Sequence, residues 1–225
     1  MEILKKPNPI SNIVLLEEHK IGYIPVPKSG CSSIKLAIAE FLNLGIPKNR
    51  IHANLKMEKI KSKSDYPDFF IFSIVRNPID RLFSAYKSKI AKKRNQIGPT
   101  LKNGAQKALA DYYGNAFYGG MTFEQYIATV CKIKDLHSDE HFRSQHFILH
   151  DRNAKPLFDF VGKLENLQED ILYLSQHHNL PLKNVGHFGN KAKYISDNLQ
   201  EVYNDKNLKD KIYSRFELDF TTFNY

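Results

Sequence analysis

The chain has 225 residues, which is long enough for one α/β domain with a well-formed core. Hydrophobic residues make up 42% of it, so the composition is that of a folded protein and excludes a disordered one. Lysine and arginine outnumber aspartate and glutamate by 33 to 24. The resulting net charge of +9 favours an anionic partner, such as a nucleotide, an acidic glycan, a nucleic acid or a membrane surface.

The two cysteines, Cys31 and Cys131, exclude a disulfide framework and a zinc pattern. No window approaches the roughly 18 apolar residues of a membrane span, and the first residues lack the apolar core of a signal peptide. We therefore expect a cytoplasmic protein without a transmembrane segment. Peripheral membrane contact stays open, and the oligomeric state cannot be read from the sequence.

The first predicted elements form a hairpin followed by a helix. Two apolar runs, 13–16 and 21–26, flank a short polar segment and predict antiparallel strands. A polar loop follows, and apolar residues then recur at helical spacing. They are Ile34, Ala37, Ile38, Phe41 and Leu42. This pattern predicts a helix with one buried face, which should stop near Gly45.

A second strand, turn and helix follow. The nearly continuous apolar run 69–75 predicts a strand that is buried on both faces. Asn77 and Pro78 are good N-cap and first-turn residues, so a helix should begin there. Because this order occurs twice, we expect an α/β fold with a central, mostly parallel sheet flanked by helices.

The rest of the chain continues the same domain. Residues 87–110 carry seven basic side chains and no acidic one, and aromatic residues follow. We interpret about 87–118 as a basic insertion that binds an anionic or sugar partner, with a mobile loop as the alternative. A strand is predicted at 158–162, a helix from Asn166, and a mainly helical segment at about 196–216. Without a repeat or a linker, 1–225 is predicted to be a single domain.

The loop between the first strand pair and the first helix carries the clearest chemistry. It contains Lys28, Gly30, Ser32 and Ser33 directly before a helix, which suits a phosphate or sulfate group. It is not a Walker A loop, because the lysine precedes the glycine. The second buried strand ends in Arg76 rather than in a carboxylate for magnesium, and an arginine suits a second phosphate group.

With these residues in view, the chain resembles the carbohydrate sulfotransferase family that uses 3′-phosphoadenylyl sulfate (PAPS), including the chondroitin type. Five segments carry the resemblance, in order along the chain: 27–35, 74–86, 139–145, 158–167 and 219–225. The first resembles the family's 5′-phosphosulfate loop and the second its 3′-phosphate motif. The resemblance implies a P-loop-kinase-like sulfotransferase fold, PAPS as co-substrate, a carbohydrate acceptor and no metal.

The resemblance also implies roles for particular residues. The 5′-phosphosulfate would be held by Lys28, Ser29, Gly30, Cys31, Ser32 and Ser33. Lys28 would stabilise the charge on the leaving phosphate. Arg76 and Ser84, eight positions apart, would hold the 3′-phosphate.

Transfer to a hydroxyl requires a general base, and nine histidines compete for this role. His52 is our first candidate, because related heparan 2-O-sulfotransferases place a catalytic histidine in this region. His141, in the segment 139–145, is the second. The catalytic residues expected are therefore Lys28 with His52 or His141. No group of residues has convincing spacing for a metal site.

Some features depart from the family. Asn77 stands where aspartate is more usual, and Arg143-Ser144 replaces a segment that often carries proline. The transmembrane stalk of animal members is absent, which suggests a soluble bacterial-type member.

The basic insertion at about 87–118 would lie on the acceptor side. The acceptor itself stays open between an acidic or lipid-linked glycan and a small glycoside. Two alternatives to a sulfotransferase also stay open. One is a P-loop-type small-molecule kinase; the other is a nucleic-acid-binding protein that uses the basic segment. We expect no nucleic-acid partner, because no recognised nucleic-acid module is present.

Overall fold

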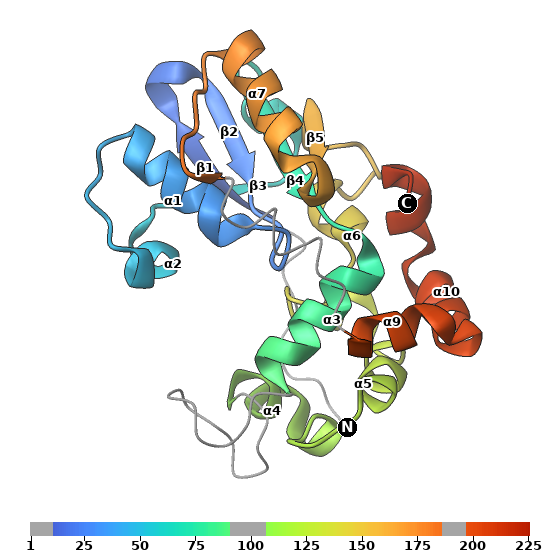
Figure 1. Ribbon diagram of the computed structural model, residues 1–225. Coiled ribbons are helices and arrows are strands. Elements are labelled where there is room, and N and C mark those ends of the chain that lie inside the picture. Colours follow the sequence, from blue (N-terminus) through green and yellow to red (C-terminus); the bar gives the residue numbers. More distant parts are fainter. Residues whose placement is uncertain (1–10, 91–106, 186–196) are drawn as a thin grey trace. The chain divides into compact units, whose positions relative to one another are not determined.

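The computed structural model describes residues 11–90, 107–185 and 197–225, which fall into two compact units (Figure 1). The first, which we call the sheet unit, contains the described residues of 11–76 and 145–185. The second, the helical unit, contains those of 77–144 and 197–225. The single domain over 1–225 and the insertion at 87–118 stay predictions, and residues 91–106 of that insertion lie outside the described residues.

The sheet unit is built on five strands in the order β3-β1-β2-β4-β5. The strands are β1 (Ser11–Leu16), β2 (Ile21–Ile24), β3 (Glu58–Ile60), β4 (Phe70–Val75) and β5 (Phe160–Lys163). The β2–β4 and β4–β5 pairs are parallel, whereas β1 is antiparallel to both β2 and β3. The α/β fold is confirmed, but the sheet is mixed rather than mostly parallel. The hairpin return places β1 antiparallel, and β3 extends that edge.

The predicted hairpin and buried strand are both confirmed. Leu16 pairs with Ile21 across the hairpin, and Lys20 turns the chain there with a left-handed φ of 52°. Residues 71–75 of β4 are all fully buried. Because β4 lies between β2 and β5, both of its edges are paired as well. The continuous apolar run follows from this central position.

Helices cover one face of the sheet. The helices of this unit are α1 (Cys31–Phe41), α2 (Ile51–Asn54), α6 (Gln145–Leu149) and α7 (Leu167–His178). Figure 1 shows α1 and α7 beside the sheet. Their apolar side chains share one core with alternate residues of β1, β2 and β4. Ile34 and Ile38 of α1 and Leu174 of α7 are completely buried in that core. The helix predicted after the loop therefore exists, although it ends at Phe41, before Gly45.

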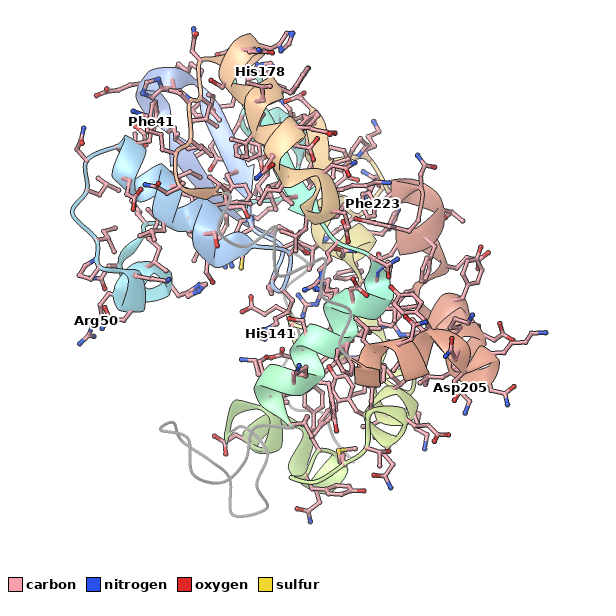
Figure 2. All side chains as sticks on the ribbon, in the orientation of Figure 1. Phe41, Arg50, His141, His178, Asp205 and Phe223 are labelled. Carbon is pink, nitrogen blue, oxygen red and sulfur yellow. The ribbon has the colours of Figure 1, made fainter. Side chains whose placement is uncertain are left out.

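The helical unit has its own core. Its helices are α3 (Pro78–Lys89), α4 (Lys107–Tyr113), α5 (Phe123–Val130), α9 (Asp197–Asn204) and α10 (Lys206–Phe223). Asn77 caps α3 as predicted, since its Oδ1 accepts from the Ile79 N–H at 3.0 Å. Asp205, labelled in Figure 2, caps α10 by accepting from the Leu208 N–H at 3.0 Å. Among the helices described, none combines the length and the apolar character that crossing a bilayer requires.

Hydrogen bonds and an ion pair made by two arginines hold the helical unit together. Arg81, only 1% exposed, donates to the carbonyls of Glu140 and Arg143 at 3.0 and 2.7 Å. On α10, Arg215 lies 2.8 Å from the Asp135 carboxylate. Burial by itself would raise the pKa of Asp135, but the hydrogen bonds and charge of Arg215 and the hydrogen bonds from Ser144 outweigh it. The pKa of Asp135 therefore lies below its ordinary value. These contacts tie segment 133–144 to α3 and α10.

Candidate active site

The parallel strands of the sheet unit end at one edge. β2, β4 and β5 run in the same direction, so the segments after Ile24, Val75 and Lys163 meet there. In α/β sheets this carboxyl edge is where ligands bind, because loops and helix N-termini converge on it. Apart from Ser84, the residues predicted to hold the donor come from the first two of these segments, 25–33 and 76.

The loop from β2 to α1 turns through two left-handed residues. Lys28 has a φ of 72° and Gly30 a φ of 77°, and α1 begins at Cys31. A Cβ on Gly30 would lie 2.8 Å from Leu164 Cδ1, so the loop packs closely on the segment after β5. The N-cap residue of α1 is Gly30, which has no side chain to cap the helix, and the first turn of α1 carries no acidic residue. The first N–H groups of α1, with the positive end of its dipole, are therefore suited to bind an anion.

The hydroxyl groups of this loop differ in exposure. Ser32 is exposed, whereas Ser33 and Cys31 are buried. Ser29 is completely buried, and its Oγ donates to Oε1 of Gln145 at 3.2 Å. Its backbone N–H donates to the Val26 carbonyl at 3.3 Å. Both donors of Ser29 are thus used inside the protein, and Ser32 is the exposed hydroxyl at the helix start.

His52 lies next to this helix start. Its Nε2 is 2.8 Å from Ser32 Oγ, a contact between residues 20 positions apart in the sequence. The short helix α2 holds it there, because Ile51 and Leu55 bury their side chains in the same core as α1. His52 itself is exposed. The structure thus brings the first candidate base to the predicted phosphosulfate loop.

Arg76 directly follows β4 and reaches the same loop. Its Nη1 donates to the Lys28 carbonyl at 3.3 Å. Its backbone is bound by Gln145, which accepts from the Arg76 N–H at 2.9 Å and donates to its carbonyl at 2.8 Å. The two predicted phosphate-binding elements are therefore in contact.

Two predicted residues, Ser84 and His141, belong to the helical unit. Ser84 lies on α3 and is partly exposed. Because Ser84 and Arg76 fall in different units, their joint binding of one phosphate stays a prediction.

His141, labelled in Figure 2, forms a pair with Asp139. Its Nδ1 is 2.7 Å from the Asp139 carboxylate, and its backbone N–H also donates to that group at 2.9 Å. Burial would raise the pKa of Asp139, but these contacts with His141 outweigh it and hold the pKa below its ordinary value. A carboxylate at Nδ1 orients the ring and leaves Nε2 for proton transfer, so His141 stays a candidate base.

A metal site can be tested for residues 11–90, 107–185 and 197–225. Within these ranges no three histidine, cysteine, aspartate or glutamate side chains lie together as a metal ion would require.

Comparison with known proteins decides the family. The model of the sulfotransferase family matches residues 11–225, nearly the whole chain. The chain belongs to the sulfotransferase family. The resemblance predicted from the five segments is thereby confirmed, and the protein is an enzyme of the sulfotransferase class.

Several relatives of this sulfotransferase are carbohydrate enzymes. Carbohydrate sulfotransferase 11 of Mus musculus is 25% identical over 97% of this chain and 68% of its own length. Carbohydrate sulfotransferase 9 of Homo sapiens is 28% identical over 96% of this chain and 53% of its own length. Carbohydrate sulfotransferase 10 of Danio rerio is 24% identical over 96% of this chain and 67% of its own length. No solved structure gives a significant match.

The sequence interpretation assigned no role to one buried residue of the candidate site. Gln145 was part of the segment 139–145 that carried the resemblance, but it received no role. The structure shows it completely buried between Ser29 and the backbone of Arg76. A glutamine in a polar segment gives no local signal of this, because its partners are 69 and 116 residues away.

Proposed function

We propose that the chain transfers a sulfuryl group from PAPS to a sugar hydroxyl, producing 3′-phosphoadenosine 5′-phosphate (PAP) and a sulfated glycan. The observation that carries the proposal is the carboxyl edge of the sheet. There His52 contacts Ser32 at the start of α1, and Arg76 donates a hydrogen bond to the Lys28 carbonyl in the loop before that helix. The carbohydrate relatives support the acceptor class.

The donor would bind along this edge. The N–H groups at the start of α1 and the Ser32 hydroxyl would hold the 5′-phosphosulfate, and the Arg76 guanidinium would hold the 3′-phosphate. The left-handed Lys28 and Gly30 fit this role, because they present the loop backbone before the helix. The strand, loop and helix order β2–α1 supports a P-loop-kinase-like arrangement with the lysine moved ahead of the glycine. Ser29, whose hydroxyl is bound by Gln145, would position the loop rather than contact the donor.

The reaction is an in-line displacement at sulfur. The acceptor oxygen forms a bond to sulfur while the bond from sulfur to the 5′-phosphate oxygen breaks. The electron pair stays on the phosphate, and the acceptor proton passes to a base. The charge that grows on the phosphate is stabilised by the Lys28 ammonium, which binds the transition state more strongly than the ground state.

His52 is the base that the geometry supports best. It lies 2.8 Å from Ser32 Oγ, at the place where the phosphosulfate would bind, so a hydroxyl attacking sulfur would approach close to its ring. His141 is the second candidate. Its pairing with Asp139 would suit proton transfer, and it is supported within the helical unit alone.

PAP binding tests the donor assignment. Isothermal titration of the whole chain with PAP should give a dissociation constant in the micromolar range or below. Arg76→Ala should weaken PAP binding far more than binding of adenosine 5′-monophosphate (AMP), which lacks the 3′-phosphate. The matched control is Arg152→Ala, an exposed arginine that should leave both affinities unchanged. If the unaltered chain does not bind PAP, the proposed function is wrong.

Turnover distinguishes the two histidines. His52→Ala should retain PAP binding but lower the transfer rate by about 10²- to 10⁴-fold, the usual contribution of a general base. His177→Ala, at an exposed position on α7, is the control and should behave like the unaltered chain. Near-normal transfer by His52→Ala, together with a loss in His141→Ala, would assign the base to His141.

A further inference from the structure

Gln145 is the first residue of α6 and has no exposed surface. Both ends of its amide form hydrogen bonds within the sheet unit. Oε1 accepts from Ser29 Oγ at 3.2 Å and from the Arg76 N–H at 2.9 Å, while Nε2 donates to the Arg76 carbonyl at 2.8 Å. A buried amide that is satisfied at both ends is rigid, because breaking any of these bonds would leave a buried polar group unsatisfied.

These bonds close a ring of contacts. Gln145 binds Ser29 on one side and Arg76 on the other, and the Arg76 guanidinium donates to the carbonyl of Lys28, the neighbour of Ser29. The loop before α1 and the end of β4 are thus linked twice, once through a side-chain amide and once through a guanidinium. Two separate links restrict both the distance and the orientation between the two elements.

We infer that Gln145 is a positioning residue that sets the 5′-phosphosulfate loop at a defined distance from the arginine for the 3′-phosphate. This inference rests on the proposed donor site. Gln145 has no exposed surface, so it would act through Ser29 and Arg76 and not by touching the donor.

Its physical effect would be to couple the two ends of the donor. The binding energy of the 3′-phosphate can lower the barrier at the distant sulfur only when the protein holds both ends of the donor in one rigid arrangement. If the loop and Arg76 could shift independently, the 3′-phosphate could bind without bringing the phosphosulfate bond to Lys28. The inference therefore predicts that the benefit of the 3′-phosphate depends on Gln145.

The test compares the affinities of PAP and AMP in three variants and the unaltered chain. Gln145→Leu keeps the approximate volume and removes the hydrogen bonds of the amide to Ser29 and to the backbone of Arg76. Gln145→Glu keeps the acceptor for Ser29 and the Arg76 N–H, but loses the donor to the Arg76 carbonyl. Gln168→Leu changes an exposed glutamine on α7 and is the matched control.

We expect Gln145→Leu to reduce the PAP-over-AMP preference by about 10-fold, a usual size for coupling between residues in contact. Gln145→Glu should show a smaller reduction, and Gln168→Leu none. A Gln145→Leu protein that is folded by circular dichroism and keeps the original preference would overturn the inference, as would equal losses for both ligands. If the unaltered chain fails to bind PAP, the proposed function fails instead.

Ser29→Ala provides a second test in case Gln145→Leu does not fold. It removes one hydroxyl from the loop and leaves the backbone of Arg76 bound to Gln145. We expect the PAP-over-AMP preference to fall by about 3-fold, and the same change in an Arg76→Ala background to have no further effect on it. An unchanged preference in Ser29→Ala, or a full additional loss in the double variant, would overturn the inference.

Discussion

Gly30→Ala should destabilise the protein for two separate reasons. Gly30 has a φ of 77°, in the left-handed region where a side chain is strained. In addition, the new Cβ would lie 2.8 Å from Leu164 Cδ1, closer than Cβ atoms approach a neighbour. Leu164 is buried, so its side chain has little room to move away.

The sequence contains a control that separates the two causes. Gly45 has a φ of 62°, but a Cβ there would meet nothing within 4 Å. Gly45→Ala should therefore lower the free energy of unfolding by the cost of backbone strain alone, about 1 kcal/mol. Gly30→Ala should lower the free energy of unfolding by the same strain and by about 1 kcal/mol more for the close contact with Leu164, since overpacking a buried site costs roughly 1 to 3 kcal/mol.

Urea denaturation followed by circular dichroism measures both losses. The total of about 2 kcal/mol for Gly30→Ala corresponds to a melting temperature lower by about 4 to 8 °C in a chain of this size. Gly45→Ala should show about half of that decrease. If Gly30→Ala is no less stable than Gly45→Ala, the close packing of the loop on Leu164 is wrong.

Three other changes test the loop, the sheet and an ion pair. Lys28→Ala should lower turnover by about 10²- to 10³-fold, and Lys28→Gly should be equally inactive. Lys28→Gly should nevertheless be more stable than Lys28→Ala, because glycine adopts the left-handed φ of 72° without strain. If Lys28→Gly is the less stable of the two in urea, that strain is refuted. Gly162→Ala places a Cβ 2.6 Å from Asp170 Oδ2 and should cost about 1 to 3 kcal/mol in the same assay, so an unchanged midpoint would contradict the packing of β5 on α7. Arg215→Met removes the arginine that lowers the pKa of Asp135. The burial of Asp135, which raises that pKa, stays the same. A carboxyl group whose pKa is lowered by folding stabilises the fold at pH values above its unfolded pKa. The variant should therefore lose about 2 kcal/mol of unfolding free energy at pH 7, and this loss should shrink as the pH falls below about 4. A loss that does not depend on pH would argue against the ion pair.

The sequence predicted those parts of the site that depend on neighbouring residues. The apolar run of β4, the cap at Asn77 and the loop before α1 are each encoded within about ten residues. The two strand, turn and helix units therefore appeared in the sequence, and with them Lys28 and Arg76. The antiparallel hairpin was predicted, but the second antiparallel pair, β1 with β3, was not, because a three-residue strand such as β3 has too few residues to show an alternating pattern.

The contacts that join these parts depend on tertiary structure. Nothing near Ser32 in the sequence indicates that His52 lies 2.8 Å away, since that contact results from the packing of Ile51 and Leu55 against α1. The bridge of Gln145 between Ser29 and Arg76 spans residues far apart in the chain.

The sequence by itself determined the class of protein and the two strand, turn and helix units, because hydrophobic spacing, capping residues and glycine positions act locally. Only the tertiary structure decided how the turns are connected. Their relative placement depends on the parallel order β2-β4-β5 and on one buried amide, and the geometry of hydrogen bonds between distant segments is set only when the chain has folded.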